Sequence, residues 1–194
     1  MKIGMIGQGA IGTYVRDALL ERGHEIAATM TRSSRVEELA DDINLVIDCA
    51  GHEALRSFGP GILGRGIDLV TVSVGALADA DTYAALQQAA LAGDAELHLA
   101  SGAIGALDCL QAARVGKLER VTYVGRKPPA GWRGSPAEQR LDLDKLDAAA
   151  VHFEGTARVA ATEYPKNANV AAAVALAGPG FDATQVRLIA DPGV

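Results

Sequence analysis

The pattern with the clearest chemical meaning is a glycine-rich turn near the amino terminus. Residues 7–12 read Gly-Gln-Gly-Ala-Ile-Gly, after a short apolar run and before a segment with helical periodicity. In that context the first glycine allows a tight turn, the second lets the backbone approach a pyrophosphate, and the third lets helix and strand pack closely. A tight turn without a ligand is the alternative. Dinucleotide binding is expected from six residues: Gly7, Gln8, Gly9, Ala10, Ile11 and Gly12.

The choice of dinucleotide depends on a second segment about 20 residues further on, where an acidic residue would bind the 2′-hydroxyl of the NAD ribose. Residues 31–35 read Thr-Arg-Ser-Ser-Arg and contain no carboxylate. Arg32 and the neighbouring hydroxyls suit the 2′-phosphate of NADP instead. The cofactor is therefore predicted to be NAD or NADP, with NADP slightly favoured, although the segment also fits an ordinary solvated loop.

Among the four histidines, His52 has the position best suited to a site. It follows Ala50 and Gly51 at the end of an apolar run over 45–50. Ligands of open α/β sheets bind at the carboxyl ends of the strands. Ala50 and Gly51 are therefore expected at the cofactor and His52 beside the substrate, but its position alone does not identify a group that would orient His52 as a base. Turn or structural roles are expected for the others: His24, His98 and His152.

A polar turn later in the chain could bind an anion. Residues 164–170 read Tyr-Pro-Lys-Asn-Ala-Asn-Val ahead of an Ala-rich segment. Lys166 and Asn167 are expected to bind an anionic substrate, with Arg126 and Lys127 as further candidate cations. Helix capping explains Asn167 or Asn169 equally well. No cluster has metal-ligand spacing, and no serine lies in a nucleophile elbow.

Alternating strands and helices are predicted to position the glycine turn and the residues expected beside it. A βαβ succession of this kind indicates an α/β fold, a Rossmann-type doubly wound parallel sheet, over 1–103. A second α+β domain, expected to bind substrate and to be incomplete, is predicted over 104–194. Strands are expected at 2–6, 24–30, 45–50, 68–74, 96–100, 120–126, 151–155 and 185–190. Helices are expected after the glycine turn, from 34, brokenly over 53–63 around Pro60, at 79–92, at 104–115, and on both sides of Pro165.

Composition excludes several classes of protein. The 194 residues carry a net charge of −6, 49% are apolar and only 4% are aromatic. This argues against disorder and against nucleic-acid binding, which needs basic and aromatic surfaces. No apolar run reaches the length of a membrane span, and none resembles a signal peptide. Cys49 and Cys109 are expected to be buried and reduced, and the protein is expected in the cytoplasm.

Several segments, taken together, resemble the L-aspartate dehydrogenase family over the whole length of the chain. The most specific are Ser101–Asp108, Arg126–Pro129 and Pro165–Val170. Further matching segments are Gly7–Gly12, Asp48–Ala54, Ser73–Leu77, Tyr123–Val124, Phe153–Arg158 and Arg187–Pro192.

The resemblance implies oxidative deamination of L-aspartate through iminoaspartate to oxaloacetate and ammonia, linked to NAD biosynthesis, by a two-domain homodimer. It also implies cofactor contacts at Ala103 and Asn169. The family's catalytic histidine lies beyond Val194, so no catalytic residue is assigned, and the chain is expected to be a fragment with weak turnover or none. Two alternatives are a non-catalytic NAD(P)-binding module and a related oxidoreductase, such as a dihydrodipicolinate reductase or homoserine dehydrogenase.

Overall fold

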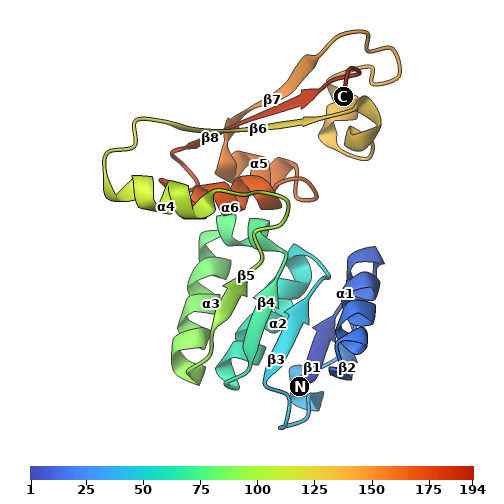
Figure 1. Ribbon diagram of the computed structural model, residues 1–194, viewed down its shortest axis with the longest axis vertical. Coiled ribbons are helices and arrows are strands. Elements are labelled where there is room, and N and C mark those ends of the chain that lie inside the picture. The colour runs from blue at the N-terminus through green and yellow to red at the C-terminus, as the bar shows by residue number, and fades with distance from the viewer. The chain divides into compact units, whose positions relative to one another are not determined.

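The computed structural model describes residues 1–194, which divide into two compact units, Met1–Gly102 and Ala103–Val194 (Figure 1). Each unit has its own sheet, and each is described by itself. None of the helices combines the length and the apolar character that crossing a membrane requires.

The first unit is built on a five-stranded sheet in the order β2-β1-β3-β4-β5. All neighbouring strands are parallel, so their carboxyl ends share one edge. The strands are β1 (Lys2–Ile6), β2 (Glu25–Met30), β3 (Leu45–Asp48), β4 (Asp68–Thr71) and β5 (Leu97–Leu99). The helices are α1 (Ala10–Glu21), α2 (His52–Gly64) and α3 (Ala80–Gly93). Right-handed crossovers place α1 on one face and α2 and α3 on the other, which confirms the Rossmann-type prediction.

Two local predictions in this unit are wrong. Helix α2 is continuous through Pro60, although proline removes a backbone donor inside a helix. Gly59, beside it, is buried so closely against Leu86 that a Cβ would lie 2.5 Å from a methyl carbon of that leucine. Helix α2 also packs against α3 around Gly59. The helix expected from residue 34 is only a single 3-10 turn, Val36–Glu38, where Glu38 accepts a hydrogen bond from the backbone N–H of Arg35 at 3.1 Å.

The second unit has a three-stranded mixed sheet in the order β6-β8-β7. The central strand β8 (Thr184–Ala190) is parallel to β6 (Val121–Lys127) and antiparallel to β7 (Ala150–Thr156). Its helices are α4 (Leu107–Val115), α5 (Ala157–Glu163) and α6 (Asn169–Ala177). Helix α6 packs against α4 and α5. Six of the nine residues of α6 are buried, because small alanine side chains allow neighbouring elements to approach closely.

No helix or strand was expected directly after β6, but the segment there contributes to the core. It contains two 3-10 turns, Pro129–Trp132 and Pro136–Gln139. Trp132 is buried, and its indole N–H donates to the backbone oxygen of Ile189 in β8 at 3.0 Å. The segment is thereby attached to the central strand.

The two cysteines also differ from expectation. Cys109 on α4 is exposed, which contradicts its predicted burial, while Cys49 is half-buried. Burial, and secondly the Asp48 carboxylate, raise the pKa of the Cys49 thiol to about 11. His98 is exposed and lies 3.4 Å from a carboxylate oxygen of Glu96.

Candidate functional site

The glycine turn lies between β1 and α1, and its three glycines have three different surroundings. Gly7 has a φ of +95°, and a Cβ there would lie 2.9 Å from the Cβ of Ala50. A Cβ on Gly12 would lie 2.4 Å from the backbone oxygen of Gly7. A Cβ on Gly9 would meet no atom within 4 Å. The first and third glycines therefore serve the fold, whereas the space in front of Gly9 is open to a ligand.

The positive end of α1, at its amino terminus, has neither a side-chain cap nor an acidic residue in its own first turn. Gly9 is the N-cap residue and supplies no side-chain hydrogen bond, and the first turn holds no acidic residue. The first N–H groups of a helix lack intrahelical partners and form its positive end. Gln8, Ala10 and Ile11 are exposed around them, Ile11 at 56%. This arrangement fits the pyrophosphate of a dinucleotide, which needs close backbone approach and N–H donors.

A second turn, after β3, lies directly against the first. Ala50 contacts the position of Gly7, and Gly51, with a φ of +107°, is the N-cap of α2. The fully buried Asp48 holds this turn in place by accepting a hydrogen bond from the backbone N–H of Ala50 at 2.9 Å. It also accepts from the hydroxyls of Thr71 at 2.7 Å and Ser73 at 2.6 Å. These bonds join the ends of β3 and β4.

The positioning role of Asp48 was not predicted. The available signal was an aspartate ending an otherwise apolar run, since a buried carboxylate must be hydrogen-bonded.

Arg32 lies at the same edge of the sheet as the glycine turn. Residue Met30 ends β2 opposite Ile6, and its backbone oxygen accepts a hydrogen bond from the N–H of Gly7 at 3.3 Å. Two residues later, Arg32 is exposed and forms no ion pair, whereas Arg35 is 3.8 Å from Glu37. Arg32 is thus an exposed cation without an ion-pair partner at this edge of the sheet.

His52 is the first residue of α2 and is half-buried. It follows Gly51 at the carboxyl edge, as predicted from the sequence, although its role there stays a prediction. Ala103 is exposed in the connection that follows β5. No group of three potential metal ligands lies together in the chain.

In the second unit the polar turn lies between α5 and α6. Asn169 is the first residue of α6, and the N-cap position belongs to Ala168. Neither Asn167 nor Asn169 is therefore the N-cap residue that the capping alternative required. Lys166 is exposed, whereas Asn167 is half-buried and accepts a hydrogen bond from the ammonium of Lys127 at 2.7 Å. The structure thus brings Lys127 to the predicted turn.

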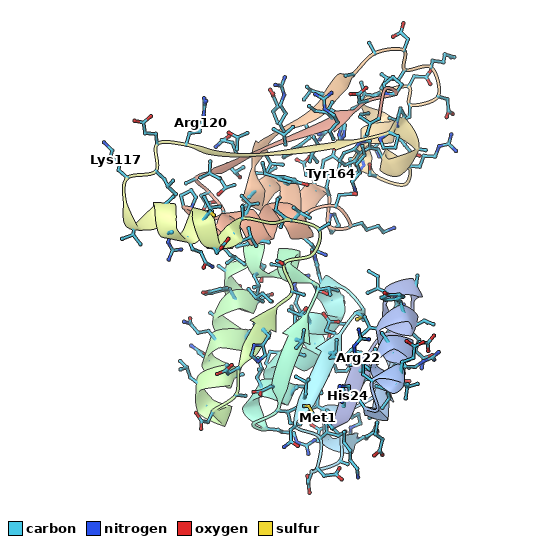
Figure 2. All side chains as sticks on the ribbon, viewed as in Figure 1. Met1, Arg22, His24, Lys117, Arg120 and Tyr164 are labelled. Atoms are coloured by element: carbon cyan, nitrogen blue, oxygen red, sulfur yellow. The ribbon has the colours of Figure 1, made fainter.

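The buried aromatic cluster beside this turn was not predicted. Tyr164 lies between the sheet and the helices of this unit (Figure 2), with its hydroxyl 3.1 Å from Nδ1 of His152. The Trp132 ring meets the His152 ring edge-on at 4.3 Å between centroids. Burial, and secondly the charge of Arg140, lower the pKa of His152 to about 4. His152 is therefore a neutral core residue near neutral pH.

The surface pockets do not by themselves identify the candidate nucleotide-binding site. The hollow at the glycine turn is small, about 20 Å³, and is lined by Gly7, Gln8 and Gly12 among others. A larger one, about 540 Å³, lies in the second unit beside residues 138–144 and includes none of the predicted site residues. The chemistry of the turn, rather than cavity size, identifies the candidate site.

Two family profiles match the chain, one in each unit. Residues 10–100 match the family described as "Homoserine dehydrogenase, NAD binding domain". Residues 108–194 match "Aspartate dehydrogenase, C-terminal". The first match concerns the nucleotide-binding unit alone, and the second concerns the other unit.

Individual relatives agree with the second profile. An L-aspartate dehydrogenase of Ruegeria pomeroyi is 52% identical over 100% of this chain and 75% of its own length. One of Pseudomonas aeruginosa is 45% identical over 99% of this chain and 79% of its own. The crystal structure of an aspartate dehydrogenase from Thermotoga maritima, 28% identical, superposes with a TM-score of 0.80 over 100% of this chain and 80% of that one.

Proposed function

This chain belongs to the L-aspartate dehydrogenase family, and we propose that it oxidises L-aspartate with NAD or NADP as the hydride acceptor. The observation that carries the proposal is the 52% identity to the Ruegeria pomeroyi enzyme over the whole chain. The glycine turn supports it independently, because an open approach at Gly9 and an uncapped α1 suit a dinucleotide. The family is one of oxidoreductases.

The proposed reaction balances as one oxidation followed by one hydrolysis. When bound, the nicotinamide accepts a hydride from Cα of L-aspartate. The amine loses a proton as the C=N bond of iminoaspartate forms. Addition of water and loss of ammonia then leave oxaloacetate, while iminoaspartate that escapes hydrolysis is available for NAD biosynthesis.

We assign each part of the cofactor to particular residues of this chain. The turn from Gly7 to Gly12 binds the pyrophosphate through backbone N–H groups, and Ala50 and Gly51 border it. Arg32 pairs with a 2′-phosphate, which is why we favour NADP slightly over NAD. The remaining cofactor contacts are assigned to Ala103 and Asn169.

We assign the substrate to three polar residues. Lys166 and Asn167 are assigned to the substrate's carboxylates, and His52 to its other polar groups. The protein is further proposed to act as a homodimer, for which light scattering on the purified protein is the direct measurement.

The test of the function is formation of reduced cofactor, followed by absorbance, with L-aspartate and either NAD or NADP. D-Aspartate, L-alanine and L-homoserine serve as controls, and reductive amination of oxaloacetate with ammonium tests the reverse direction. Turnover, whatever its rate, is expected to be selective for L-aspartate. Oxidation of homoserine in place of L-aspartate would overturn the proposal.

A further inference from the structure

Lys127 is a cation whose surroundings lack a counter-charge. It is the last residue of β6 and is half-buried. Its ammonium lies 4.9 Å from the centre of the Trp132 ring and donates one hydrogen bond, to Asn167. It forms no ion pair, although the adjacent Arg126 is paired with Asp191. An ammonium that gives up water without gaining a carboxylate is unfavourable, and burial accordingly lowers the pKa of Lys127.

The hydrogen bond to Lys127 also determines how Asn167 presents its amide. The amide oxygen faces the ammonium at 2.7 Å, so the NH₂ group, with its two donors, points away from it. The backbone of Asn167 is held as well, because its N–H donates to the oxygen of Tyr164 at 2.8 Å. Two N–H groups of the lysine and the amide NH₂ are therefore left for other acceptors.

The start of α6 adds positive potential immediately after Asn167. Its N-cap residue, Ala168, makes no side-chain hydrogen bond, and its first turn contains no acidic residue. The positive end of the helix dipole is thus not offset by a carboxylate of that helix. Ammonium, amide donors and helix terminus together present an arrangement suited to an anion.

The three candidate cations of this region are distinguished by their contacts. Arg126 is occupied by Asp191, and Lys166 is exposed and forms no hydrogen bond or ion pair through its side chain. Lys127 is held from two sides, by the Trp132 ring and by Asn167. A held donor loses less conformational entropy when it binds a ligand than a freely moving one does.

We propose that Lys127 and Asn167 form a carboxylate-binding site in the second unit and that this site receives one of the two carboxylates of the substrate. The inference rests on the proposed function for the identity of that substrate. It gives Lys127, rather than Lys166, the main role in charge recognition. It also explains how a protein of net charge −6 can bind a dianion, since the positive charge is concentrated locally.

Trp132 is the only tryptophan of the chain, so its fluorescence reports directly on this site. The chain is titrated with L-aspartate and succinate, and separately with acetate and chloride at matched ionic strength. We expect a saturable change in fluorescence with the two dicarboxylates. Isothermal titration calorimetry on the same samples measures binding independently of the fluorophore.

Three variants test the assignment. Lys127→Met keeps an unbranched chain against the Trp132 ring but removes the charge, and we expect dicarboxylate affinity to fall by about tenfold or more, the range for losing one charged hydrogen bond. Asn167→Ala should show a smaller loss. The matched control is Lys117→Met, because Lys117 is exposed in the connection between α4 and β6 (Figure 2) and should bind dicarboxylates like the parent chain. Thermal melting establishes that each variant is folded.

The outcomes separate this site from the proposed function. Loss of dicarboxylate binding in Lys127→Met, with NADPH binding retained, supports the site, because the glycine turn belongs to the other unit. Equal dicarboxylate affinity in Lys127→Met and Lys117→Met overturns it. A response to chloride equal to that for succinate also overturns it. Oxidation of homoserine rather than L-aspartate, alongside selective dicarboxylate binding, would contradict the proposed function and leave the site standing.

Discussion

The two glycines Gly9 and Gly12 should respond in opposite ways to the same added methyl group. In Gly9→Ala the new Cβ meets no atom within 4 Å, and the backbone φ of −71° suits any L-residue. Folding stability should therefore stay unchanged or rise by up to about 1 kcal/mol, because alanine restricts the unfolded chain. The nucleotide should bind about tenfold more weakly or worse, since the methyl occupies the space that a pyrophosphate approaches.

In Gly12→Ala the Cβ would lie 2.4 Å from the backbone oxygen of Gly7 and 3.1 Å from its carbonyl carbon. Neither atom belongs to a flexible side chain, so α1 must move away from the turn. Overpacking of this kind costs about 1–3 kcal/mol. For a unit of this size each kcal/mol lowers the melting temperature by roughly 4–8 °C.

Circular dichroism melting and titration with NADPH, followed by its fluorescence, measure the two effects separately. The expected pattern is a stable Gly9→Ala protein that binds poorly and a Gly12→Ala protein that melts early. If Gly9→Ala binds NADPH as tightly as the parent chain, the pyrophosphate does not approach the backbone at Gly9. If both variants melt alike, the packing argument for Gly12 is refuted.

Three further predictions concern single side chains. Arg32→Asp should weaken NADPH binding by about tenfold and leave NADH binding unchanged, because it replaces a partner of the 2′-phosphate with a negative charge. Equal effects in titrations with both nucleotides would contradict the 2′-phosphate assignment. Asn169→Ala should weaken nucleotide binding by about 1–3 kcal/mol, measured in the same titration, and unchanged affinity would remove it from the cofactor site. The pKa of His152 is about 4 in the folded protein against 6.5 without burial. The unfolded chain therefore binds more protons in that range, and stability should fall as the pH drops from 6.5 to 4, by at most about 3 kcal/mol. Urea unfolding across this range checks it, and a His152→Gln variant with the same pH dependence would show that another group is responsible.

Local chemistry in the sequence determined the cofactor turn and the fold class. A G-x-G-x-x-G pattern between a short apolar run and a helical one has few structural interpretations, because the first glycine allows a tight turn, the second leaves room for a ligand and the third allows close helix packing. The alternation of strand and helix likewise predicted the parallel sheet, since parallel strands need long crossovers. These inferences depend on neighbours within a few residues of one another.

Tertiary structure alone decided the contacts between distant segments. Nothing near Lys127 in the sequence indicates that its partner is Asn167, 40 positions away, or that Trp132 attaches its loop to Ile189. Pro60 predicted a break, yet α2 is continuous and packs against α3. Cys109 lay in an apolar run, yet it is exposed on α4, a helix without buried residues. Asp48 required the ends of two strands to meet before its three hydrogen bonds could form. Periodicity records which residues avoid water on average, whereas the identity of each partner follows from how separate elements pack.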